Sequence, residues 1–265
     1  MRVVIAGLGK SGTTALVYAV AAAMPPGTRV LFEPREYVEV PAGHVAAKVV
    51  LHPRFPLEHR FFRQFDHVVL LARDPRDLLV SKALYRIFGG KVHADQAKVD
   101  RYLELLRAKE QDPRSVSLLD INRAYQGFVG PTLHSDEGLT RILTDAMAFH
   151  DAFPDALLFH YEDMVAGRFD AVAGFLGLAA AAMKPVIPPG LQRVVRTRRA
   201  GNWRDWFCPE DVTHYRPLVA AYMARYGYAD DWTLAPAPSI RPEECSGYVM
   251  RLVREPRGQV AAAGR

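Results

Sequence analysis

A glycine-rich loop near the start of the chain constrains the fold more than any other feature. The apolar residues 3–6 predict a buried strand, and residues 7–14, G-L-G-K-S-G-T-T, lead from it directly into an apolar helix. Glycines let backbone N–H groups approach a ligand closely, and such groups at a helix N-terminus attract anions. The loop therefore predicts a phosphate-binding turn in an α/β fold.

Short apolar strands alternate with helical patterns over the first 160 residues. Strands are predicted at 3–6, 29–32, 45–51, 67–72 and 157–161, and helices at 13–24, 57–64, 75–87 and 139–153. This alternation is typical of a central parallel sheet flanked by helices. We expect one domain over residues 1–234. An insertion at 89–138, with an amphipathic helix at 97–109 and loops, is a candidate acceptor pocket or lid. Residues 235–265 read as a Pro-rich linker and a basic tail.

Composition limits the class of protein. Two cysteines, Cys208 and Cys245, provide neither a disulfide framework nor zinc-ligand spacing, which favours a cytoplasmic location. The longest apolar stretch, residues 15–24, is about half of a membrane span, and a strand from residue 3 predicts no signal peptide. A net charge of +5 indicates an anionic partner. Residues 193–204, here called the arginine loop, hold five arginines and no acid.

The glycine loop fits three nucleotide-binding motifs to different degrees. Read as G-x-G-x-x-G, its glycines match a dinucleotide fingerprint, and Glu33 stands where that fingerprint has a ribose-binding acid. Read as a Walker A loop, it ends correctly in G-K-S, but Val4 occupies the place of the first glycine, which disfavours a standard kinase or GTPase. The third interpretation takes residues 10–14, K-S-G-T-T, as the unit.

Those five residues and three later segments resemble motifs of bacterial-type P-loop sulfotransferases, which use 3′-phosphoadenosine 5′-phosphosulfate (PAPS). Residues 68–81 read V-V-L-L-A-R-D-P-R-D-L-L-V-S, residues 161–163 read Y-E-D, and residues 196–204, R-T-R-R-A-G-N-W-R, are similar to the family's R-K-G-x-x-G-D-W-K. The resemblance covers residues 1–207 approximately and combines features of cytosolic and carbohydrate sulfotransferases. It implies an α/β, P-loop-type three-layer fold with a central parallel sheet flanked by helices.

The resemblance also assigns roles to particular residues. It implies that Lys10 stabilises the leaving phosphate, that Arg73 and Ser81 hold the 3′-phosphate, and that Tyr161 lies against the adenine. Arg196, Arg198 and Arg199 are alternatives for a further 3′-phosphate contact. The implied cofactor-binding residues are Gly9, Lys10, Ser11, Gly12, Thr13, Thr14, Arg73, Ser81, Tyr161, Arg196, Arg198, Arg199 and Gly201.

Glu33 and His52 are the candidate general bases that would deprotonate an acceptor hydroxyl. Glu33 lies in F-E-P, a segment that looks like one in carbohydrate sulfotransferases, and His52 follows the third strand at the family's distance from Arg73. Alternatively, Glu33 forms a salt bridge with a nearby arginine such as Arg35, and His52 only caps a strand before proline. We expect Lys48 to be a solvated strand lysine. Because sulfuryl transfer resembles phosphoryl transfer, positioning and electrostatics should suffice without a metal.

The sequence thus predicts a sulfotransferase with PAPS or PAP and a small-molecule or carbohydrate hydroxyl acceptor as partners, and with no nucleic acid and no membrane span. The oligomeric state stays open. Three alternatives are an NAD(P)-dependent oxidoreductase, an atypical P-loop kinase, and a nucleotide- or RNA-binding module that uses the arginine loop with Trp203 and Trp206. A dehydrogenase has no need for Arg73 and Ser81 or for the arginine loop, so sulfuryl transfer is preferred.

Overall fold

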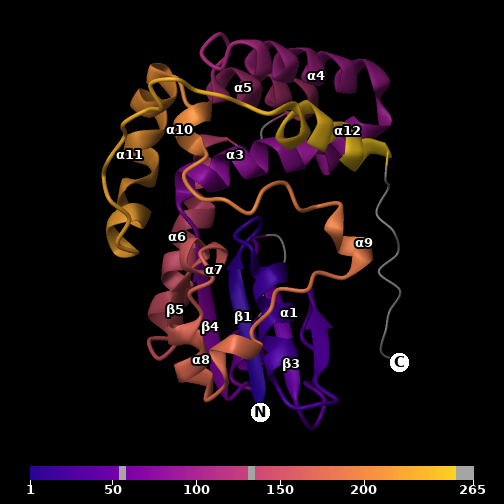
Figure 1. The fold of residues 1–265 in the computed structure, drawn as a ribbon, viewed down its shortest axis with the longest axis vertical. Coiled ribbons are helices and arrows are strands. Elements are labelled where there is room, and N and C mark those ends of the chain that lie inside the picture. The colour runs from indigo at the N-terminus through magenta and orange to yellow at the C-terminus, as the bar shows by residue number, and fades with distance from the viewer. Residues whose placement is uncertain (54–57, 131–134, 255–265) are drawn as a thin grey trace. The chain divides into compact units, whose positions relative to one another are not determined.

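The computed structural model describes residues 1–53, 58–130 and 135–254, and these divide into two compact units (Figure 1). The first unit comprises residues 1–74 and 141–187, and the second comprises residues 75–140 and 188–254 of the described part. The expected domain over residues 1–234 therefore contains the first unit and most of the second.

The first unit is built on a five-stranded parallel sheet in the order β2-β3-β1-β4-β5. Its strands are β1 (Arg2–Leu8), β2 (Arg29–Phe32), β3 (Val45–Leu51), β4 (His67–Ala72) and β5 (Leu157–His160). All five strands lie where the sequence predicts them, to within two residues at each end. The predicted α/β fold with a central parallel sheet is confirmed.

β1 is the central strand because β3 is bonded to one of its edges and β4 to the other. Residues 3–6 have no exposed surface, as expected for a parallel strand that is covered on both faces. After β1 the chain continues to β2 and β3, which lie on one side of β1 in the sheet. After β4, which lies on the other side of β1, it continues to β5 further out on that side. In open α/β sheets, ligands bind outside the carboxyl ends of the strands at such a switch point.

The strand order also separates two interpretations of the glycine loop. In the dinucleotide-binding fold, β2 lies next to β1, so an acid at the end of β2 reaches the ribose of a nucleotide held by the loop. Here β3 lies between β1 and β2, and Glu33 follows β2. Glu33 is therefore two strands away from the glycine loop, and this order does not support the oxidoreductase alternative.

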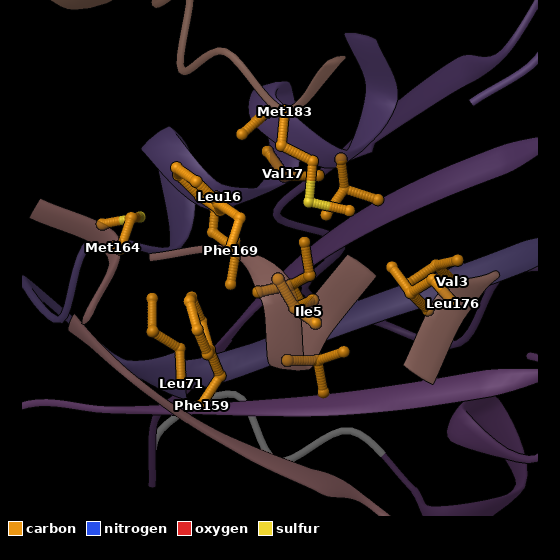
Figure 2. Packing of buried hydrophobic residues seen from close by; sticks show 14 of the residues in the cluster. Val3, Ile5, Leu16, Val17, Leu71, Phe159, Met164, Phe169, Leu176 and Met183 are labelled. Atoms are coloured by element: carbon orange, nitrogen blue, oxygen red, sulfur yellow. The ribbon is translucent and has the colours of Figure 1, made fainter. Parts of the chain in front are cut away.

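A hydrophobic core packs against the sheet in the first unit (Figure 2). In it, side chains of β1, β4 and β5 meet α1 (Thr13–Ala23), α7 (Tyr161–Val165) and α8 (Asp170–Leu176). Its members include Val3, Ile5, Leu16, Val17, Leu71, Phe159, Met164 and Leu176. Residues 3 and 5 of β1 belong to this core and residue 4 does not, because successive side chains point to opposite faces. The core thus fixes α1 on the sheet, directly after the glycine loop.

The other helical elements of this unit are α2 (His59–Phe62) and η2 (Ala180–Ala182), and α6 (Asp136–Ala152) contains residues of both units. The second unit is mostly helical. Its elements are α3 (Pro75–Tyr85), η1 (Arg86–Ala94), α4 (Gln96–Gln111), α5 (Leu118–Val129), α9 (Pro189–Gln192), α10 (Trp203–Trp206), α11 (Pro209–Arg225), η3 (Pro242–Glu244) and α12 (Ser246–Arg254). None of the helices in the described ranges combines the length and apolarity needed to cross a membrane.

Helices α5 and α12 form in segments where the sequence analysis expected loops and a tail. α5 forms where we expected loops, because Ser117 caps its first turn and Leu118, Ile121 and Tyr125 are buried on one face. α12 forms within the expected tail, because its Tyr248, Val249 and Leu252 have no exposed surface. The remainder of that tail, residues 255–265, lies outside the described residues.

We predict that Gly7→Ala destabilises the protein much more than Gly9→Ala. A Cβ at position 7 would lie 2.7 Å from Ser11 Oγ and 2.8 Å from the Leu71 carbonyl oxygen, whereas a Cβ at position 9 meets its nearest atom at 3.7 Å. Overpacking of this kind costs about 1–3 kcal/mol. Urea unfolding of both variants measures the difference, and equal losses would contradict the packing argument.

Candidate functional site

A predicted site residue or loop follows every strand of the sheet. Residues 9–14 follow β1, Glu33 follows β2, His52 follows β3, Arg73 follows β4, and Tyr161 follows β5. Because the strands are parallel, their carboxyl ends lie at one edge of the sheet. The structure therefore brings these residues to the edge where α/β proteins bind ligands.

The glycine loop turns sharply between β1 and α1. The Ser11 N–H donates to the Leu8 carbonyl at 3.0 Å, and Lys10 and Gly12 both adopt positive φ angles, of 75° and 99°. The N-cap residue of α1 is Gly12, which has no side chain to cap the helix, and free N–H groups at a helix N-terminus are suited to bind an anion. The Ser11 hydroxyl is buried and has no hydrogen-bond partner among the described residues. Buried hydroxyls are ordinarily hydrogen-bonded, so a ligand with acceptor oxygens would suit this position.

Arg73, Tyr161 and Gly12 form a packed cluster behind this loop. The Arg73 guanidinium lies over the Tyr161 ring, 4.1 Å from its centroid, and Nη1 donates to the Lys10 carbonyl at 2.8 Å. A Cβ on Gly12 would lie 2.7 Å from the Tyr161 ring, so only glycine allows the loop to pack this closely. Arg73 Nε is buried without a hydrogen-bond partner among the described residues.

The resemblance places Tyr161 against the adenine, and the cluster gives its ring a different contact. Tyr161 is only 6% exposed, and the Arg73 guanidinium covers one face of the ring. The next residue, Glu162, accepts a hydrogen bond from the Asp74 N–H at 3.0 Å. Burial raises the pKa of Glu162, and this hydrogen bond opposes the rise. Tyr161 and Glu162 together connect the segment after β5 to the segment after β4.

Glu33 is bound by Lys48 of the neighbouring strand β3. Lys48 on β3 donates a hydrogen bond to the Glu33 carboxylate, and its ammonium lies 4.3 Å from the centroid of the Phe32 ring. Lys48 is 5% exposed, so the expectation of a solvated lysine is wrong. Burial lowers the pKa of Lys48, and the Glu33 charge opposes this. The pairing fixes the position of the Glu33 carboxylate. The Glu33 backbone has a positive φ angle of 51°.

His52 is half-buried and follows β3 directly. Residue 51 of β3 pairs in register with residue 8 of β1, at the start of the glycine loop. His52 thus leaves the sheet about one strand spacing (~4.8 Å) from the loop, and Glu33 leaves it about two spacings away. The backbone arrangement places His52 nearer to the loop than Glu33.

In the second unit, Asp77 anchors the arginine loop. The buried Asp77 carboxylate on α3 accepts hydrogen bonds from the N–H of Gly201 at 2.7 Å and of Trp203 at 2.9 Å. Gly201 has a positive φ of 76°, which favours glycine at that point. Ser81 is also buried and lies on the same helix, four residues further along.

The tryptophans of the arginine loop belong to the core of the second unit. The Trp203 ring contacts the guanidinium groups of Arg76 and Arg204, whose Cζ atoms lie 4.3 and 4.6 Å from its centroid. Trp203 is 1% exposed and Trp206 is 3% exposed. Single-stranded nucleic acid is bound by stacking bases on accessible rings, and these two rings are covered. This observation disfavours the RNA-binding alternative.

The three arginines that the resemblance left as alternatives have different surroundings. Arg199 is exposed and pairs with Glu244, with 2.5 Å between Nη2 and Oε2. Arg198 is also exposed, whereas Arg196 is half-buried. Of the three, Arg196 is the one that the structure holds at a partly enclosed position.

Sequence reasoning missed several residues that organise these groups. Lys48 had a signal, because it is a single lysine within the buried strand V-A-A-K-V-V-L. The sequence indicated only that Asp77 lies in the first turn of a helix. No neighbouring residue indicated that its carboxylate binds the distant N–H groups of Gly201 and Trp203. Tyr248 and Arg251 of α12 carried no motif at all, although both bond to backbone carbonyls of the arginine loop.

Comparison with known proteins identifies solved structures that have a similar fold. No family model matches the sequence, and no curated protein matches it. Among solved structures, mouse sulfotransferase SULT7A1 complexed with PAP is similar at a TM-score of 0.50 and 14% identity, over 84% of each chain. Retinol dehydratase in complex with androsterone and the inactive cofactor PAP matches at a TM-score of 0.42 and 16% identity, over 89% of this chain and 82% of that one. By the first of these matches, the chain has the fold of a sulfotransferase.

We predict that the stability of the protein rises with pH between about 8 and 10 through Lys82, the residue after Ser81. Burial lowers the pKa of Lys82 to about 8, whereas the unfolded chain keeps the ordinary value of 10.5. In that range the unfolded state binds more protons than the folded state, so the free energy of unfolding increases with pH.

Urea unfolding across this pH range tests the prediction. Lys82→Met should show a smaller rise than the wild type, while Lys184→Met, which replaces an exposed lysine, should follow the wild type. An identical rise in Lys82→Met and the wild type would show that Lys82 does not titrate in this way.

Proposed function

We propose that this protein is a PAPS-dependent sulfotransferase that acts on a hydroxyl group of a small molecule or carbohydrate. The observation that carries the proposal is that two buried donors at the edge where the strands end, Ser11 Oγ and Arg73 Nε, have no hydrogen-bond partner within the described part of the chain. A nucleotide with phosphate groups would supply acceptors for both of them. The sulfotransferase fold supports the same assignment.

PAPS would supply an activated sulfuryl group. On this proposal, the N–H groups and hydroxyls of residues 11–14 bind the 5′-phosphosulfate, and Lys10 neutralises the negative charge that develops on the leaving phosphate oxygen. Arg73 and Ser81 bind the 3′-phosphate on this proposal, as the resemblance implies, and one of Arg196, Arg198 and Arg199 adds a further contact. The Tyr161 ring stacks on the Arg73 guanidinium and positions it, in addition to any contact of the ring with the adenine.

In the transfer step, the acceptor oxygen forms a bond to sulfur while the bond between sulfur and the bridging phosphate oxygen breaks. The electron pair of that bond stays on the phosphate, which gives PAP, and the acceptor proton passes to a general base. Charge is spread over the sulfuryl oxygens in the transition state, so fixed donors around them lower the barrier. A preorganised glycine loop provides such donors at no cost of reorganisation during the reaction.

Glu33 and His52 are both proposed as the base, and the sheet supports each in a different way. His52 leaves the strand that neighbours the glycine loop. Glu33 follows the outer strand, but Lys48 fixes its carboxylate by a direct hydrogen bond. Either group could accept a proton from a hydroxyl that lies between it and the sulfuryl group.

The first experiment measures nucleotide selectivity. PAP at about a hundredfold above its dissociation constant should stabilise the protein by about 2.7 kcal/mol, whereas AMP, ATP and NADP at the same concentration should stabilise it less. Lys10→Ala should weaken the PAP effect, and Lys184→Ala should preserve it. Thermal shift and calorimetric titration provide the measurements. A response to NADP or ATP with indifference to PAP would overturn the proposal in favour of an oxidoreductase or a kinase.

The second experiment identifies the base. Replacement of the true base, by Glu33→Gln or His52→Asn, should lower turnover by at least about 100-fold and leave PAP affinity unchanged, because only the proton transfer is lost. Steady-state turnover with an identified acceptor and calorimetry with PAP give the two quantities. If both variants keep wild-type turnover, neither residue is the base.

A further inference from the structure

The last two helical elements of the described chain bind the backbone of the arginine loop. We propose that η3 and α12, residues 242–254 and here called the C-terminal clamp, position this loop for recognition of a 3′-phosphate. The inference rests on the proposed function, since it assigns the loop to that phosphate. The resemblance to sulfotransferases ends near residue 207, so it assigns no role to this segment.

α12 binds three consecutive carbonyl groups of the arginine loop. The Tyr248 hydroxyl donates to the Val194 carbonyl at 3.1 Å. Arg251 donates through Nη2 to the Val195 carbonyl at 2.9 Å and through Nε to the Arg193 carbonyl at 3.4 Å. Burial raises the pKa of Tyr248, so its hydroxyl remains a donor at neutral pH. These contacts determine the path of residues 193–195.

η3 binds the same loop a few residues further along. The Glu244 carboxylate pairs with Arg199 at 2.5 Å and also with Arg241, and its side chain is only 9% exposed. The Asn202 side-chain amide donates to the Arg199 carbonyl at 2.9 Å, and Asp77 binds the N–H groups of Gly201 and Trp203. Residues 199–203 are therefore held by a second set of contacts.

Between these two held stretches lie only residues 196–198, which include Arg196. A short span with both ends fixed has little backbone freedom left to lose when a ligand binds. Glu244 also neutralises one of the arginines of the loop, which reduces repulsion among the cations. The conformational entropy of the backbone around Arg196 is thus lost when the protein folds, so less of it is lost when a ligand binds. Tyr248 and Arg251 are positioning residues on this account and do not contact the nucleotide.

The test compares PAP with AMP, which lacks the 3′-phosphate. The variant Tyr248→Phe/Arg251→Met removes the three donors and keeps the buried ring and the aliphatic bulk. We expect its affinity for PAP to fall by about tenfold and its affinity for AMP to change by less than about twofold, because only the 3′-phosphate needs the loop. The matched control is Arg254→Met, an exposed arginine on the same helix. Calorimetry measures both affinities.

Amide hydrogen exchange provides a second readout that does not depend on the proposed function. Exchange at residues 196–198 should be faster in the double variant than in the wild type and in Arg254→Met. If the wild type does not prefer PAP to AMP, the proposed function fails, and the exchange data alone decide whether the clamp orders the loop. If the wild type prefers PAP and the double variant keeps both its selectivity and its slow exchange, the clamp has no positioning role. Tyr248→Phe alone, which preserves the core, provides the same comparison should the double variant not fold.

Discussion

The contact of Arg73 with Tyr161 connects three strand ends of the first unit, and the geometry of the glycine loop depends on it. Arg73 follows β4, Tyr161 follows β5, and the loop follows β1. The guanidinium stacks on the ring and also binds the Lys10 carbonyl, while Gly12 packs against the ring from the loop side. Loop and guanidinium are thereby fixed before any ligand arrives, which is the condition for effective electrostatic stabilisation of an anion.

The second unit fixes its own cationic segment by a different means. The arginine loop is too rich in positive charge to pack by itself, since like charges repel at short range. Asp77 and Glu244 bind it through two N–H groups and one guanidinium, and α12 binds its carbonyls. Trp203, whose ring contacts the guanidinium groups of Arg76 and of the loop's own Arg204, joins the end of the loop to the core. Each unit thus presents cations on a backbone that is held by several independent contacts.

The outcome at Glu33 and Lys48 shows where sequence reasoning was sufficient and where it was not. The F-E-P segment directed attention to Glu33, but no local pattern identified Lys48 as its partner, because Glu33 follows β2 whereas Lys48 lies on β3. The register of β2 and β3 brings them together. The same register explains why the expectation that Lys48 is solvated was wrong: residues 45–49 of β3 are buried as a block between two neighbouring strands.

The sequence by itself determined the strands, the glycine loop and the order of the motifs, because local periodicity and spacing depend only on neighbouring residues. Tertiary structure alone decided the strand order, which places β3 between β1 and β2 and moves Glu33 away from the loop. It also decided the partners of Asp77 and the role of α12, whose contacts join residues more than fifty positions apart. Such contacts follow from how the elements pack, and packing depends on all of the elements together.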